Sequence, residues 1–349
     1  MKKKSLNYLL RLFLGIFLFV EFGCSTQTAD DLKFEKALWC HKTTFVIDGN
    51  YRADSVLNQY KNLGISTLFY GVGFLPYSDW NFLDSLIVDC HRYNIELHPY
   101  IIVGYKNDPN SDVVKNHPEW MVVRMDGEKT TNLNLANAEV RDFVVRLSAP
   151  FLDHDIDGLH LDYIRFDLHQ NFSYDSLTCE IFKNEYGTSP LDLDKDTGDP
   201  LWCEWLDWNA GKVTQLVRDL REMIKRSGRD IPLSAAVFPD ARAAKYEIGQ
   251  EWELWVKEGL LDIVCPMIYV KNTPVFTKYV VQAMEISQGK AKVIVGIWLG
   301  NRYHRNVDPE TMAEHMLITK KEGAGGTSFW SARSFTEEYQ QKFKTLNLE

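Results

Sequence analysis

The sequence predicts a single (β/α)8 barrel, and three observations lead to this fold class. From Glu35 onward, eight short runs rich in β-branched and aromatic residues alternate with longer segments of helical period. The chain has 349 residues, 45% of them hydrophobic, which is enough to bury one large core. No GxGxxG turn follows the first run, so an open, doubly wound sheet is the weaker alternative.

The eight runs are the predicted strands of the barrel. They cover residues 43–48, 66–72, 95–103, 158–166, 231–238, 263–269, 292–299 and 327–332. Between them, apolar residues recur three and four positions apart, which gives each intervening helix one face to lay against the strands. Asn137 is expected to cap the helix that follows it. Four tryptophans on helical segments are expected in the core: Trp205, Trp208, Trp252 and Trp255.

The N-terminus has the pattern of an export signal. A basic start precedes an apolar run from Tyr8 to Val20, which is shorter than the ~20 residues that span a membrane. Gly23 and Cys24 follow the run, and a small residue directly before a cysteine is typical of lipoprotein processing. An uncleaved membrane anchor is the alternative, because Glu21 stands where such signals usually carry leucine.

The chain is therefore predicted to have three segments. Residues 1–23 form a lipoprotein signal peptide, residues 24–34 form a polar tether that begins at the lipidated Cys24, and residues 35–349 form the barrel. We expect the mature protein in the cell envelope, held to a membrane by its N-terminal lipid on the periplasmic or the surface face.

The composition argues against nucleic acid as a partner and against a cofactor. The formal net charge is -9, and removal of a basic signal makes the mature domain more acidic still. The six cysteines include no CxxC pair of the kind that binds zinc. Aspartates within residues 192–199 match a calcium loop only in part, so a solvated loop is favoured there. We predict neither a metal nor another cofactor.

The predicted fourth strand carries the strongest catalytic candidate. Reactive groups in (β/α)8 barrels lie at the C-terminal ends of the strands. Alternation turns Leu159 and Leu161 toward the helices and His160 and Asp162 toward the barrel interior, with Asp162 nearer the mouth. We predict that Asp162 is catalytic, and a structural ion pair with Arg165 is the alternative. His160 is expected to orient Asp162 or to contact substrate.

A carboxyl group at this place suits glycoside hydrolysis, which needs a second carboxyl group across the scissile bond. On the predicted fifth strand, Phe238 shares a face with Asp240, which would stand at the mouth of the barrel. Asp240 is therefore the predicted second acid, and a turn aspartate after Pro239 is the alternative. Asp48 and Asp167 are rival candidates.

Aromatic and polar side chains near the other predicted strand ends suggest a surface for sugar rings. Gly296 would open space beneath the ring of Trp298. Two long segments, residues 104–132 and 167–201, are expected to wall the cleft. The predicted substrate-binding residues are His98, Tyr100, Asn134, His160, Tyr269, Trp298 and Trp330.

Several stretches taken together resemble the bacterial glycosyl hydrolase-like 10 family, over about residues 35–336. They are residues 117–120 (HPEW), 133–137 (LNLAN), 139–143 (EVRDF), 157–166, 233–240, 252–259, 261–264 and 266–269. The resemblance implies a (β/α)8 barrel related to polysaccharide-degrading enzymes, with Asp162 as the catalytic candidate. This chain has one aspartate at that place, where many relatives have an adjacent pair.

Three functions follow, in order of preference. The first is a cell-envelope glycoside hydrolase that acts on a poly- or oligosaccharide through paired carboxylates. The second is a carbohydrate-binding lipoprotein without catalysis, because no glutamate stands at the C-terminal end of a predicted strand. The third is metal-dependent hydrolysis or deacylation, which would need His98, His160 and Asp162 to converge, with Asp48 as a further candidate ligand.

Overall fold

The computed structural model describes residues 33–346, apart from residues 74, 105–106, 170–171, 196–197 and 302–303. The predicted signal peptide, Cys24 and nearly all of the tether therefore lie outside the described residues. In the part of the chain that is described, no helix combines the length and the apolar character needed to cross a membrane.

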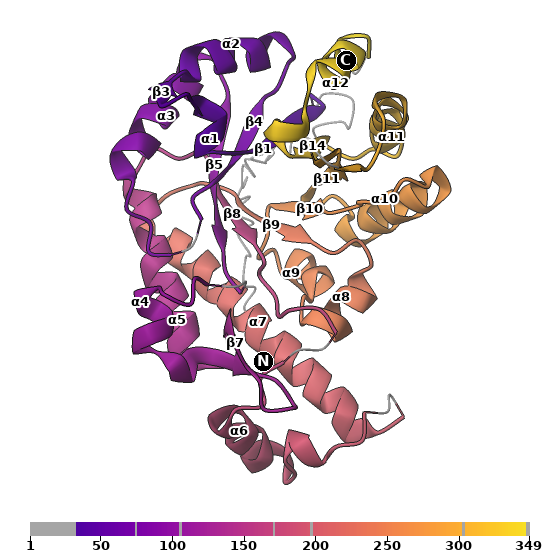
Figure 1. The fold of residues 1–349 in the computed structure, drawn as a ribbon. Coiled ribbons are helices and arrows are strands. Elements are labelled where there is room, and N and C mark those ends of the chain that lie inside the picture. Colours follow the sequence, from indigo (N-terminus) through magenta and orange to yellow (C-terminus); the bar gives the residue numbers. More distant parts are fainter. Residues whose placement is uncertain are drawn as a thin grey trace, which may run out of the picture. The chain divides into compact units, whose positions relative to one another are not determined.

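Eight parallel strands close into a barrel, which confirms the predicted fold class (Figure 1). The strands pair with one another in chain order, and the last pairs with the first. They are β1 (Glu35–His41), β4 (Thr67–Gly71), β5 (Glu96–Ile102), β8 (Leu159–Asp162), β9 (Leu233–Val237), β10 (Ile263–Pro266), β11 (Lys292–Trp298) and β14 (Gly326–Trp330).

Helices between the strands cover the outside of the barrel (Figure 1). Asn137 caps one of them as predicted, since its side chain accepts a hydrogen bond from the backbone N–H of Glu139. The four tryptophans assigned to helix packing are buried, which confirms their place in the core. The helices are α2 (Ala53–Asn62), α3 (Trp80–Arg92), α5 (Ala138–Ser148), α7 (Pro200–Ser227), α8 (Ala241–Ile248), α9 (Trp252–Lys257), α10 (Thr273–Ser287), α11 (Pro309–Lys321) and α12 (Glu337–Lys344).

The first strand lies earlier in the chain than predicted. Residues 43–48 do not form it; they belong to a helical turn, α1 (Lys42–Phe45), and to β2 (Val46–Ile47), which pairs with β3 (Asn50–Tyr51) as an antiparallel hairpin. The β-branched residues that suggested a barrel strand pair locally instead. Asp48 is consequently an exposed turn residue with φ 48, away from any barrel strand end, and this corrects its candidacy as an acid.

The two long segments hold secondary structure of their own. Residues 104–132 include α4 (Asp112–Asn116), a 3-10 turn η2 (Pro118–Trp120), β6 (Met121–Val123) and most of β7 (Lys129–Leu133). Residues 167–201 include α6 (Ser176–Tyr186), which lies beside the N-terminal part of α7, and a 3-10 turn η4 (Pro190–Asp192). The remaining short elements are η3 (Ala149–Asp153), β12 (Gly300–Asn301), β13 (His304–Arg305) and η5 (Ala332–Ser334).

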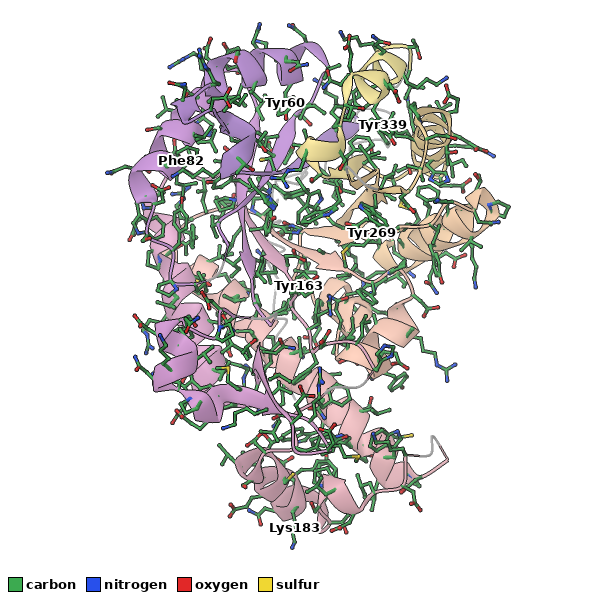
Figure 2. All side chains as sticks on the ribbon, in the orientation of Figure 1. Tyr60, Phe82, Tyr163, Lys183, Tyr269 and Tyr339 are labelled. Atoms are coloured by element: carbon green, nitrogen blue, oxygen red, sulfur yellow. The ribbon has the colours of Figure 1, made fainter. Side chains whose placement is uncertain are left out.

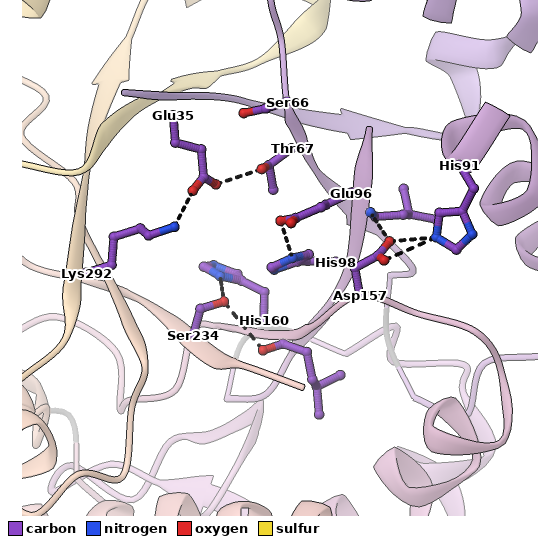
Figure 3. Close-up of polar contacts among 12 residues, drawn as sticks. Glu35, Ser66, Thr67, His91, Glu96, His98, Asp157, His160, Ser234 and Lys292 are labelled. Atoms are coloured by element: carbon purple, nitrogen blue, oxygen red, sulfur yellow. Dashed lines mark hydrogen bonds and ion pairs between the residues drawn. The ribbon is translucent and has the colours of Figure 1, made fainter. Parts of the chain in front are cut away.

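The N-terminal end of the barrel is filled by a polar cluster. Lys292 Nζ donates to Glu35 Oε2 at 2.9 Å, and the Thr67 hydroxyl donates to Glu35 Oε1 at 2.7 Å (Figure 3). Nearby, His98 Nε2 lies 3.5 Å from Glu96 Oε2. Glu35 is buried, and a buried charge is stable only with such partners. Because side chains fill this end of the barrel, open space for a ligand is left at the C-terminal ends of the strands.

Candidate active site

Two cavities at the C-terminal ends of the strands share Trp39, Tyr269 and Trp330. We call them the Asp162 cavity, of about 420 Å³, and the Arg333 cavity, of about 450 Å³. Both volumes fall in the range of about 300–1,000 Å³ that is common for ligand sites. The other residues that line the Asp162 cavity are Asp162, Tyr163, Arg165, Phe238, Pro239 and Met267. The other residues that line the Arg333 cavity are Cys40, His41, Thr43, Thr44, Trp298, Gly300, Ser331, Ala332, Arg333 and Ser334.

Asp162 is the last residue of β8, and its side chain is 5% exposed. Its Oδ1 accepts a hydrogen bond of 2.8 Å from the backbone N–H of Tyr163, which adopts the left-handed conformation with φ 50. Burial raises the pKa of Asp162 to about 6, against the opposing effects of that hydrogen bond and of the charge on Arg165. A carboxyl group with this pKa can hold a proton near neutral pH and give it up.

Two aromatic side chains contact Arg165, which lines the same cavity as Asp162. The guanidinium of Arg165 lies over the ring of Tyr163 at 4.2 Å and over that of Phe238 at 5.0 Å, and its Nη1 donates to the carbonyl of Phe166. Burial, followed by the charge of Asp162, raises the pKa of Tyr269 well above its usual range. The Tyr269 hydroxyl therefore keeps its proton beside the carboxyl group. Tyr163 and Tyr269 are labelled in Figure 2.

Trp39 is part of the wall shared by both cavities, and it is absent from the predicted site residues. Its ring centroid lies 4.7 Å from that of His160, 5.0 Å from that of Tyr100 and 5.3 Å from that of Trp330. The omission followed from placing the first strand too late. Alternation within β1 was the available signal, because Trp39 shares a face with Ala37 that packs inside the barrel.

His160 has a different partner from the one expected. Its Nδ1 forms a hydrogen bond of 2.7 Å with the Ser234 hydroxyl, and its ring packs against Trp39 and Phe69. Burial holds the pKa of His160 well below its usual range, so the imidazole is neutral. The prediction that His160 orients Asp162 is therefore corrected: His160 is fully buried and supports the floor of the site.

Three other residues predicted to contact substrate do not line either cavity. His98 is fully buried among barrel residues, with its ring 5.7 Å from that of Phe69. Tyr100 is 1% exposed, and its hydroxyl lies 3.2 Å from His41 Nε2. The Asn134 amide nitrogen donates to Asp175 and Thr178, which joins β7 to α6. This arrangement gives the three side chains structural contacts and does not support direct contact with substrate.

Trp298, Trp330 and Tyr269 line the cavities, and their contact with substrate stays a prediction. The reason offered for Gly296 is corrected, however. A Cβ on Gly296 would lie 3.2 Å from the carbonyl oxygen of Pro266 and 3.3 Å from the Cα of Met267. Glycine is needed because the backbone at the end of β10 approaches β11 closely, and the space is not left open beneath Trp298.

Asp162 is the one carboxylate among the described residues that line the two cavities. Asp240 comes directly after Phe238 and Pro239, which line the Asp162 cavity, but its Oδ1 accepts from the backbone N–H of Ala243 at 2.9 Å and caps α8. Asp167 is half-buried, and its Oδ1 accepts from the backbone N–H of Leu168. The catalytic role predicted for Asp240 stays a prediction.

Neither long segment walls the cavities as predicted, since no described residue of residues 104–132 or 167–201 lines them. Over the same described part of the chain, no three His, Cys, Asp or Glu side chains come together as a metal would require. The ligand set of the metal-dependent alternative, which included Asp48, is thus not assembled.

Comparison by sequence gives one family. A family model described as glycosyl hydrolase-like 10 matches residues 77–316. No curated protein has a significant sequence match to the chain.

Comparison by structure gives barrels from carbohydrate-active enzymes. The glycoside hydrolase domain of PgaB (BpsB) from Bordetella bronchiseptica is similar with a TM-score of 0.71 and 13% identity, over 90% of this chain and 99% of that one. A β-galactosidase from the psychrophilic Marinomonas ef1 has a TM-score of 0.63 and 12% identity, over 88% of this chain and 56% of that one. Catalytic domain 2 of a group II chitinase from Ostrinia furnacalis has a TM-score of 0.51 and 14% identity, over 88% and 92%. At such identities the similarity is one of fold.

Proposed function

Because the chain belongs to the glycosyl hydrolase-like 10 family, we propose that it hydrolyses glycosidic bonds in a poly- or oligosaccharide, with Asp162 as the proton donor. The observation that carries the proposal is the state of Asp162. It is a buried carboxyl group of pKa about 6, and it lines a cavity at the C-terminal mouth of the barrel, where this fold places its chemistry.

In the proposed reaction, protonated Asp162 gives its proton to the glycosidic oxygen while the bond from that oxygen to the anomeric carbon breaks. Positive charge then develops on the sugar ring, next to the carboxylate that Asp162 has become. Water supplies the new hydroxyl group at the anomeric carbon. The Tyr269 hydroxyl, kept protonated by its surroundings, is available to donate a hydrogen bond to the sugar or to Asp162.

We further propose Asp240 as the second carboxyl group, which would activate water or act as the nucleophile. Its support is its position, because it follows Phe238 and Pro239 directly and these line the Asp162 cavity. One of its oxygens accepts from the first turn of α8. The second oxygen would have to serve the reaction, since one carboxylate oxygen is committed to the cap.

The aromatic side chains supply the surface on which sugar rings would lie. Trp39 and Trp330 border both cavities, so a saccharide that spans them would contact both rings. Sugar rings present apolar faces to aromatic rings and hydroxyl groups at their edges. A substrate of at least two sugar units is consistent with two adjoining cavities.

The test is hydrolysis by the full-length chain, purified in detergent, of a panel of glycans that includes β-galactosides and chitooligosaccharides. New reducing ends are measured for the native protein and for Asp162→Asn. We expect cleavage of at least one glycan by the native protein and a loss of about 10²–10⁴-fold in the variant, the usual share of acid–base catalysis. Asp167→Asn is the matched control, because Asp167 is a neighbouring carboxylate outside both cavities.

A carbohydrate-binding protein without catalysis is the second candidate function. It is favoured by the same lining residues, since among those described Asp162 is the one carboxylate that faces the cavities. Sugar binding needs no second acid. Saturable binding of a glycan by the native protein, without new reducing ends over long incubation, would favour this function over hydrolysis.

We also propose that the protein is a cell-envelope lipoprotein attached to a membrane through Cys24. The support is in the sequence, where a basic start, a short apolar run and Gly23 precede Cys24. In a bacterial host, incorporation of a labelled fatty acid should be seen in the native chain and lost in Cys24→Ser. Label retained in that variant would contradict the anchor.

A further inference from the structure

The Arg333 cavity differs in charge from the Asp162 cavity beside it. Arg333 is the cation among its described lining residues, and the set includes no carboxylate. The chain as a whole has 48 acidic and 39 basic residues. The charge that lines this cavity is therefore opposite in sign to the net charge of the chain. A cavity of this kind attracts an anion.

From this arrangement we propose that the Arg333 cavity binds a sugar unit that carries a carboxylate, as a uronic acid does. The proposal rests on the proposed function, because it makes the carboxylated unit the neighbour of the unit on which Asp162 acts. Arg333 would be its specificity-determining residue. A guanidinium presents paired N–H donors that match the two oxygens of a carboxylate.

The contacts of Arg333 leave its charge available to a ligand. Arg333 belongs to η5, directly after β14, and its side chain is exposed. The neighbouring Ser334 hydroxyl donates to the carbonyl of Gly300 at 2.6 Å, which ties this turn to the segment after β11. No carboxylate in the described part of the chain makes an ion pair with Arg333. The backbone of the turn is thus fixed while the guanidinium keeps its charge.

Neutral hydrogen-bonding groups complete the cavity. His41 lies at the end of β1, and burial followed by the charge of Arg333 lowers its pKa, which leaves its imidazole uncharged near pH 7. Thr43 and Ser331 add hydroxyl groups that can donate to a carboxylate or to sugar hydroxyls. The lining therefore offers one positive charge and several neutral donors. This combination complements a sugar that carries a single negative charge.

The shared wall links this binding to the reaction. Because Trp39, Tyr269 and Trp330 border both cavities, adjacent units of one saccharide can occupy them together. A carboxylate held by Arg333 would then fix which bond lies at Asp162. The expected substrate class is an acidic oligosaccharide or polysaccharide in which the unit next to the cleaved bond is a uronic acid.

The test measures binding separately from cleavage. The full-length chain carrying Asp162→Asn is titrated by calorimetry with oligomers of galacturonate, glucuronate and mannuronate, each paired with its carboxyl-reduced counterpart. We expect at least one acidic oligomer to bind about tenfold more tightly than its neutral counterpart, as one charge-assisted contact allows. Adding Arg333→Gln should remove most of that difference, and Arg333→Glu should favour the neutral oligomer.

Arg226→Gln is the matched control, since Arg226 is an exposed arginine in the last turn of α7 and lines neither cavity. Equal binding of every acidic and neutral pair would overturn the inference, as would an equal loss in the Arg226 variant. If neutral glycans are cleaved, and the cleavage is lost in Asp162→Asn but unchanged in Arg333→Gln, the proposed hydrolase is supported and this specificity is not. If acidic oligomers bind through Arg333 but the native protein cleaves no glycan, the proposed hydrolase activity is contradicted and the binding of acidic sugars in the Arg333 cavity is supported.

Discussion

The imidazole of His160 stands edge-on to the indole of Trp39, with ring centroids 4.7 Å apart and planes inclined by 86°. The Ser234 hydroxyl forms a hydrogen bond with His160 Nδ1, so a fixed imidazole packs against the indole that both cavities share. His160, two positions before Asp162 on β8, therefore packs against the aromatic wall that both cavities share and makes no hydrogen bond with Asp162 in the described part of the chain.

His160→Gln tests this role. We expect weaker binding of oligosaccharide, because Trp39 loses its supporting ring, and a loss of about 1–3 kcal/mol in the free energy of unfolding, because buried polar contacts are left unmade. The pH dependence of hydrolysis should keep its shape. Urea denaturation and kcat/KM across pH provide the measurements. If the variant shifts the pH at which kcat/KM falls, the protonation of His160 is coupled to that of Asp162.

The pH dependence of kcat/KM should report the proton on Asp162. Its pKa is raised to about 6, chiefly by burial, and a proton donor is active only while protonated. Activity should therefore fall as pH rises through about 6, with one proton lost on that limb. Initial rates at substrate concentrations far below KM give the value for the free enzyme. An activity that instead rises through pH 6 would make Asp162 a base or a nucleophile.

Asp162→Asn should stabilise the fold at pH 7. A buried carboxylate whose pKa is raised from 3.8 to about 6 destabilises the native state wherever it is ionised, and the neutral amide removes that cost. The gain in unfolding free energy should be on the order of 3 kcal/mol above pH 6, shrink as pH falls toward 4, and vanish below. Denaturation at pH 7 and pH 4 checks it, and an equal gain at both would contradict the cause.

Asp240 can be tested without disturbing the helix that it begins. Asparagine caps a helix about as well as aspartate, so Asp240→Asn keeps the contact with Ala243 and removes only the charge. We expect at least a hundredfold loss of hydrolysis with an unchanged melting temperature. Asp240→Ala should lose about 1 kcal/mol of stability in addition. Full activity in Asp240→Asn would remove Asp240 as the second acid.

Gly71 at the end of β4 leaves room for Tyr100. A Cβ at this position would lie 2.6 Å from the Tyr100 hydroxyl, so Gly71→Ala must displace a ring that contacts Trp39 and His41. We expect a loss of about 1–3 kcal/mol in stability and weaker glycan binding. Gly211→Ala in α7 is the control, because its Cβ meets nothing within 4 Å, and it should stabilise the helix slightly.

The local sequence pattern was sufficient for the fold class and for one face of β8. Seven of the eight predicted strands overlap barrel strands, because β-branched and aromatic runs between helical segments are a signal carried within each segment. Alternation within residues 159–162 likewise turned Asp162 toward the interior, since parity along a strand is a local property. The same pattern misplaced the first strand, where a hairpin and a barrel strand use the same residue types.

The (β/α)8 fold and the place of Asp162 at the end of its strand could thus be read from the chain. The side chains that meet there could not. Trp39 and Arg333 line one cavity, His160 forms its hydrogen bond with Ser234, and Asp240 caps a helix. These contacts depend on how the barrel closes. Contacts between residues far apart in the chain depend on strand register and tilt, and these are set by packing of the whole interior, which no single segment encodes.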